Sequence, residues 1–160
     1  MAEEIDIDRL VCIVVGVQLR AELGDRPLAY RIEHEVRTRL EAALGKPPEG
    51  EYPRLSPVVI TDVYYLNNEP LHARPAISVG GPAMNALSAM LVDQLPTAVA
   101  VENTLVVQMD LEMTDVRCAV WGMDHLDTVR AVDLFIGKYL DTFVRGVLTS
   151  LDEDTGPGSD

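Results

Sequence analysis

Residues 75–96 read PAISVGGPAMNALSAMLVDQLP and contain a strand, a glycine turn and a helix in direct succession. The short apolar run before Gly80 is bounded by a proline, as expected of a buried strand. Gly80-Gly81-Pro82 ends this run, and apolar residues recur at helical spacing from Met84 to Leu95, directly before Pro96. A strand that leads through glycines into a helix is typical of α/β sheets, so this segment indicates the fold class.

Two further strands and another helix are predicted before this segment. Residues 10–17, LVCIVVGV, form an uncharged β-branched run, which is typical of a strand buried on both faces. After Gly24-Asp25-Arg26, Pro27 suits the first position of a helix, and apolar residues recur every four positions as far as Leu44. Residues 57–66, PVVITDVYYL, have the composition of a second strand, and a turn signal follows them.

The second half of the chain predicts a β-meander or edge hairpin followed by a long helix. Short β-type runs occupy residues 98–101, 104–111 and 116–120. Asp124, with Asp127 three residues later, resembles a capping pair that opens a helix to about Leu148. The apolar arc of this helix is wide, so the helix either lies deep against the sheet or also meets a second copy of the chain.

These elements together predict a three-layer Rossmann-like α/β sandwich with a mixed, mostly parallel sheet. Its hairpin precedes a long C-terminal helix. The length of 160 residues suits one domain, which we expect to span residues 1–150. Residues 151–160 are acidic and almost free of apolar side chains, so we expect a disordered tail there.

The composition disfavours several kinds of partner. With 26 acidic and 13 basic residues, the formal charge is -13, which disfavours binding to nucleic acid and to anionic membranes. The longest apolar stretch, residues 10–19, is too short to span a bilayer, and no signal-peptide pattern precedes it, so we expect a cytoplasmic protein. The sequence has no CxxC pair, no GxGxxG motif and no P-loop, so we expect neither a metal nor a cofactor.

The turns that follow the predicted strands are the candidate sites, because ligands of open α/β sheets bind beyond the carboxyl ends of the strands. Gln18 follows the first strand, and Gly80-Gly81 with Asn85 follows the third. Backbone N–H groups of this glycine turn and the start of its helix could bind a phosphate or carboxylate. Alternatively, the glycines serve only the geometry of the turn, and Asn85 forms local hydrogen bonds.

The turn after the last strand carries the other candidates. Trp121 is the single tryptophan, and Asp124 and His125 stand next to each other at the predicted helix start. These two side chains could form an acid/base pair, since a helix N-terminus favours a neutral imidazole. Alternatively, Asp124 is an ordinary N-cap and His125 is exposed to solvent.

Two stretches, RPAISVGGPAMNAL and CAVWGMDHLDTVRAV, resemble elements of the Rossmann-like domains in archaeal surface-layer proteins. The first stretch shares a strand that leads through GGPxxN into a helix. The second shares a strand followed by the continuous pattern G-x5-TxxAV. The resemblance implies that Gly80, Gly81, Pro82 and Asn85 shape one strand-to-helix turn, and that Gly122 and Thr128 shape another. In that family the domain serves self-assembly, so the resemblance implies a non-enzymatic role.

Two functional hypotheses follow. In the first, the chain is a non-catalytic binding or assembly module of a larger cytosolic system, which forms a homodimer or docks on a protein partner. In the second, it is a small enzyme or sensor that binds a nucleotide-like or other anionic metabolite at Gly80-Gly81, with Asp124 and His125 performing the chemistry.

Overall fold

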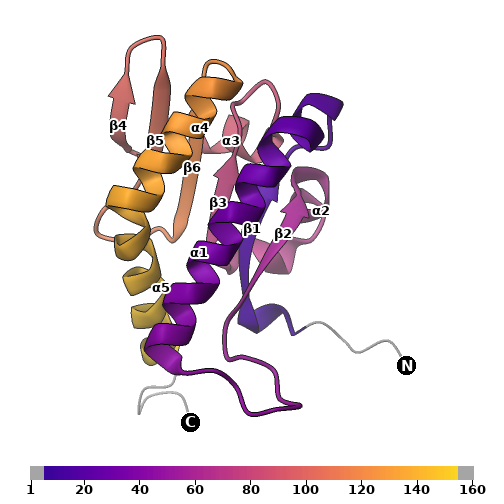
Figure 1. Cartoon of the computed structure of the whole chain (residues 1–160), viewed down its shortest axis with the longest axis vertical. Helices are drawn as coiled ribbons and strands as arrows, with labels where there is room; N and C mark the ends of the chain where they lie inside the picture. Colours follow the sequence, from indigo (N-terminus) through magenta and orange to yellow (C-terminus); the bar gives the residue numbers. More distant parts are fainter. Residues whose placement is uncertain (1–5, 155–160) are drawn as a thin grey trace.

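The computed structural model describes the backbone of residues 6–154 and the side chains of residues 6–151, and its strands form one mixed, mostly parallel sheet. The strand order is β2-β1-β3-β6-β5-β4 (Figure 1). The first four strands in this order are parallel: β2 (Ser56–Thr61), β1 (Leu10–Val15), β3 (Ala76–Val79) and β6 (Arg117–Gly122). The antiparallel strands β5 (Leu105–Met109) and β4 (Thr97–Val101) form the predicted hairpin at one edge.

Helices cover both faces of the sheet, which confirms the predicted three-layer α/β fold (Figure 1). One face is covered by α1 (Arg26–Leu44) and by the long C-terminal helix, whose parts are α4 (His125–Leu134), η4 (Phe135–Tyr139) and α5 (Leu140–Asp154). The opposite face is covered by α2 (Asp62–Leu66), η3 (Glu69–Ala73) and α3 (Ala86–Leu91). A short turn, η1 (Ile7–Arg9), precedes β1. Because side chains alternate along a strand, Ile13 contributes to the first core and Val14 to the second.

The C-terminal helix uses its wide apolar arc within the chain. Phe135, Leu140 and Phe143 are fully buried against the sheet, and of the predicted arc only Leu126 is strongly exposed. Of the two alternatives for this helix, the structure therefore shows deep packing against the sheet. The helix continues to Asp154, so residues 151–154 extend it. Residues 155–160 of the expected tail lie outside the described residues.

The first helix begins earlier than the sequence predicts. It starts at Leu19, passes through a π turn, η2 (Ala21–Asp25), and continues into α1. Pro27 explains the π turn, because proline has no N–H and its ring would collide with the carbonyl of Leu23 in a regular helix. The backbone widens instead, and the Arg26 N–H bonds to the Ala21 carbonyl. The prediction that the helix begins at Pro27, after Gly24-Asp25-Arg26, is therefore wrong, because these three residues already lie within the helix.

The second strand ends at Thr61, and residues 62–66 form α2 rather than the predicted continuation of the strand. The Thr61 hydroxyl accepts the Tyr64 N–H at 3.1 Å and so caps this helix. The buried carboxylate of Asp62 accepts the N–H groups of Val63 and Ala86, both at 2.8 Å. The cap and this buried carboxylate override the strand propensity of the tyrosine-rich segment.

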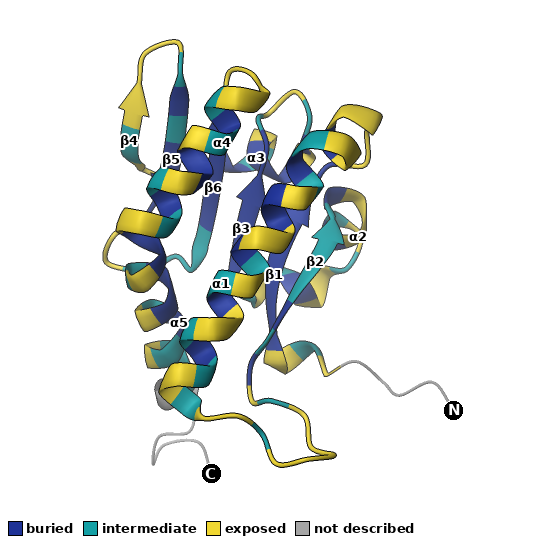
Figure 2. Ribbon diagram, in the orientation of Figure 1, coloured by how far each residue is buried: buried dark blue, intermediate teal, exposed yellow. Residues whose placement is uncertain are grey.

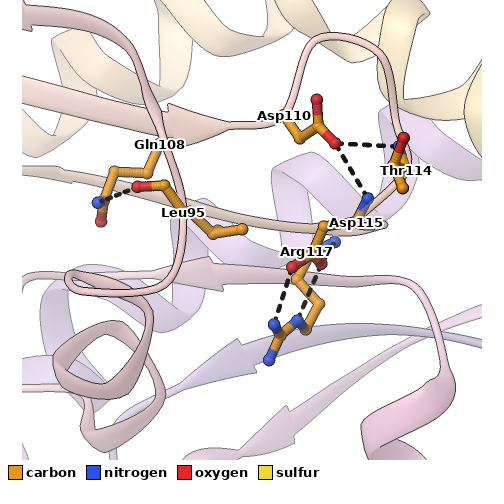
Figure 3. Close-up of polar contacts among 6 residues, drawn as sticks. All are labelled: Leu95, Gln108, Asp110, Thr114, Asp115 and Arg117. Carbon is orange, nitrogen blue, oxygen red and sulfur yellow. Dashed lines mark hydrogen bonds and ion pairs between the residues drawn. The ribbon is translucent and has the colours of Figure 1, made fainter.

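Side-chain hydrogen bonds fix the hairpin beside β6 (Figure 3). The Gln108 amide donates to the Leu95 carbonyl at 3.2 Å, which ties β5 to the end of the α3 segment. The Asp110 carboxylate accepts the Asp115 N–H at 3.1 Å within the β5–β6 connection. Asp115 also accepts two hydrogen bonds from the Arg117 guanidinium, at 2.8 and 2.9 Å. These contacts set the position of β6, whose carboxyl end contributes to the site described next.

Candidate functional site

The carboxyl ends of three parallel strands lie at the same level of the sheet. Val15 of β1 is paired with Val79 of β3, which is paired with Val120 of β6. The chain leaves β1 toward the face of α1 and leaves β3 toward the face of α3. Such a reversal is where open α/β sheets bind ligands. A hollow of about 750 Å³ lies at this edge, lined by Thr128 and by side chains from residues 20–25, 81–84 and 121–125.

The crevice between β1 and β3 is itself filled by the chain. A Cβ atom on Gly16 would overlap the carbonyl oxygen of Met84, so the turn after β3 crosses directly against the end of β1. Gln18 is exposed and does not line the hollow. The hollow therefore lies beside β3 and β6, and it brings together Gly81 and Trp121 but not Gln18.

Both glycines of the predicted turn lie close to a neighbouring side chain, and the approach is tightest at Gly80. Gly80 has a φ of +110°, and a Cβ atom there would lie 2.5 Å from Oδ2 of Asp25. Gly81 lies against the Trp121 indole, with its Cβ position 3.3 Å from Cδ1. Gly80 is thus covered by Asp25, whereas Gly81 lines the hollow.

Asn85 has a structural role in this turn. Its buried amide donates to the carbonyls of Val14 and Val79, at 3.0 and 3.1 Å, and so joins the ends of β1 and β3. Its Oδ1 accepts the N–H groups of Leu87 and Ser88, at 2.9 and 3.2 Å, and so caps α3. All hydrogen-bonding positions of the side chain are occupied, as in the alternative in which Asn85 bonds locally.

The turn after β3 offers few donors to an anion. The Gly80 N–H bonds to the Val120 carbonyl, and the N–H groups of Met84 and Asn85 bond to the Gly81 carbonyl. At the start of α3, the Ala86 N–H already bonds to the Asp62 carboxylate. This geometry does not favour an anion at Gly80-Gly81, because the donors that would hold it are engaged within the chain.

Asp124 acts as the N-cap of α4. Its carboxylate accepts the Asp127 N–H at 2.8 Å, and its carbonyl accepts the Thr128 hydroxyl at 2.9 Å. The Thr128 hydroxyl also accepts the Gly122 N–H at 3.0 Å, which fastens the end of β6 to the helix. The exposed His125 ring points instead toward Gly24, whose Cβ position would lie 3.0 Å from Nδ1. Asp124 therefore caps α4, whereas the adjacent His125 faces the helix turn at Gly24.

Asp25 is the residue of this site that the sequence did not reveal. Its side chain lines the hollow, and the residue is only 8% exposed. Burial raises the pKa of the Asp25 carboxyl from 3.8 to about 6, against the smaller opposing effect of the His125 charge. No local signal identifies Asp25, because its position depends on the packing of the η2 turn against the end of β3. Carboxyl groups with raised pKa values in clefts are frequent at functional sites.

The lining of the hollow includes part of an exposed apolar rim. We define it as four exposed residues, Leu19, Leu23, Met123 and Leu126, whose exposed fractions are 72%, 72%, 59% and 58%. Leu23 and Met123 both line the hollow; Leu19 precedes Leu23 by one turn of its helix, and Leu126 follows Met123 by three residues at the start of α4. Figure 2 shows these exposed segments before α1 and at the start of α4. The site therefore combines the buried carboxyl group of Asp25 with exposed apolar side chains.

No known protein family matches the chain, and no curated protein matches its sequence. Among the described residues, no three His, Cys, Asp or Glu side chains gather in a way that could hold a metal ion. Within residues 6–154, the helices lack the combination of length and apolar composition that crossing a bilayer requires. What the chain does must therefore be inferred from the hollow and its rim.

Proposed function

We propose that this chain is a non-catalytic binding module of a larger cytosolic assembly and that it docks a protein on the apolar rim. The supporting observation is that Leu23 and Met123, each more than half exposed, line one hollow, and that the equally exposed Leu19 and Leu126 lie within four residues of them in the sequence. Large apolar side chains that gather at one place on a surface are typical of protein contacts. Their burial by a partner would remove apolar surface from water, which favours association.

The charge of the chain bears on the identity of the partner. At a formal charge of -13, two copies repel each other, whereas a basic partner is attracted. A different protein with basic residues is therefore the better supported partner, and a homodimer is the alternative. An enzyme or sensor for an anionic metabolite has less support, because Asp25 lies against Gly80 and Asp124 serves as a helix cap.

Site-specific photo-crosslinking in cells of the native host tests this proposal. A photoreactive phenylalanine derivative is placed at Leu23 or at Met123, and the matched control carries it at Tyr52, which is exposed on the loop after α1. We expect one discrete adduct from each rim position and none from the control. An adduct of twice 17.6 kDa would identify the homodimer, and any other mass a different partner. If the rim positions give no adduct, the docking proposal is wrong.

A further inference from the structure

The hollow is lined by the mostly buried carboxyl group of Asp25. Within the described residues, no hydrogen bond or ion pair reaches the Asp25 side chain. The nearby His125 ring forms no contact with it inside the 4.0 Å that defines an ion pair. A charge that is mostly removed from water is normally matched by an opposite charge or by hydrogen bonds. The unmatched carboxylate therefore points to a group that binds from outside the chain.

Two unusual backbone features place this carboxylate. The π turn caused by Pro27 ends at Asp25, and π turns inside helices are frequent at functional sites. Gly80 supplies the space for the carboxylate, because any side chain at this position would come within 2.5 Å of Oδ2. The π turn before α1 and the glycine after β3 thus both make room for the Asp25 carboxylate.

The walls of the hollow suit an aliphatic chain. Leu23, Met84 and Trp121 line the hollow together with Asp25 and supply apolar surface to it. Arg20 also lines the hollow, but it is exposed and keeps its charge in water. A ligand that lies along these walls with a positive charge at its end would match both the apolar contacts and the carboxylate.

We propose that the hollow binds a protonated amine at the end of an aliphatic chain, namely a lysine side chain of the docked protein, and that Asp25 is the carboxylate that receives it. The source of the amine rests on the proposed docking function. The ammonium group donates hydrogen bonds to the Asp25 oxygens, and the methylene groups of the lysine side chain pack against Leu23, Met84 and Trp121. A neutral group would leave the carboxylate charge unmatched, and an anion would be repelled by it.

The fluorescence of Trp121 reports on this site, because the chain has a single tryptophan and it lines the hollow. Butylammonium, butanol and butyl phosphate are titrated at pH 7.5 and constant ionic strength. We expect a saturable change with butylammonium, and binding at least about tenfold weaker for the other two compounds, since hydrogen bonds to charged groups contribute that much. If butanol or butyl phosphate binds as tightly as butylammonium, the proposal is overturned.

The variant Asp25→Asn should bind butylammonium at least about tenfold more weakly, while Asp93→Asn, a change at an exposed carboxylate outside the hollow, should not alter binding. Unchanged affinity in Asp25→Asn would also overturn the proposal. The comparison of the three compounds uses the natural chain, so it holds even if this variant fails to fold.

A final comparison separates the amine site from the docking function. The peptide acetyl-Leu-Lys-Leu-amide should bind at least about tenfold more tightly than butylammonium, because its leucines also contact the rim, and its norleucine analogue should lose this affinity. If the peptide binds no better than butylammonium, the docking function is wrong and the ammonium site stands. If the norleucine analogue binds as well as the lysine peptide, the ammonium site is wrong and docking stands.

Discussion

Asp25→Asn should stabilise the chain at neutral pH and have a smaller effect in acid. Burial raises the pKa of this carboxyl from 3.8 to about 6, a difference of roughly two units. Each unit corresponds to about 1.4 kcal/mol, so the charged carboxylate lowers the free energy of unfolding by about 3 kcal/mol. Asparagine has a similar shape and no charge, so the variant avoids this cost.

The sign follows from proton binding. Because the pKa is higher in the folded chain, the folded state keeps its proton where the unfolded state has lost it, between about pH 4 and pH 6. The contribution of Asp25 to stability is therefore present below pH 4 and is lost as the pH rises through 6. The advantage of the asparagine variant over the natural chain should grow by about 3 kcal/mol across this range.

Urea unfolding, followed by Trp121 fluorescence at intervals from pH 4 to pH 7.5, measures this difference. The other carboxyl groups are common to both chains, so their titration cancels. Asp93→Asn serves as the control, and its difference from the natural chain should stay flat. A flat difference for Asp25→Asn, or one that falls as the pH rises, would refute the reasoning that Asp25 is buried without a partner.

Three further substitutions test the turns around the hollow, each by urea unfolding. Gly80→Ala should cost about 1–3 kcal/mol, because the left-handed φ strains alanine and its Cβ meets Asp25; an unchanged midpoint would contradict that close approach. Asn85→Ala should cost about 2–4 kcal/mol through the loss of four hydrogen bonds, and a loss below 1 kcal/mol would mean that they are not all formed. Thr128→Val should cost about 1–3 kcal/mol, since it leaves the Gly122 N–H without an acceptor, and a neutral effect would show that water replaces the hydroxyl.

Sequence patterns predicted the layers of the fold because each strand and helix carries its own periodicity. The apolar run of β1 and the amphipathic spacing of α1 are local properties, and so is the capping pair at Asp124. Two errors in the first half of the chain arose where one side chain changes the backbone. Pro27 produces a π turn in place of a helix start, and the Thr61 cap turns a strand-like segment into α2.

The candidate site was predicted in part for the same reason. Gly81, Trp121 and His125 gather because the carboxyl ends of parallel strands share one edge, which follows from the fold class alone. Asp25 was not predicted, because its burial depends on how closely the helix start approaches Gly80. The exposure of Gln18 likewise depends on the path of the turn after β3, which no local pattern records.

The contact between Gly16 and the Met84 carbonyl limits how this scaffold can change. In open α/β sheets ligands bind in the crevice where the strand order reverses, but here the Met84 carbonyl lies directly against Gly16 at the end of β1. Replacing side chains would not vacate the crevice, since the obstruction is main chain. Only shortening or rerouting residues 81–85 would reopen this crevice, so a ligand that binds there would require insertions or deletions rather than point substitutions.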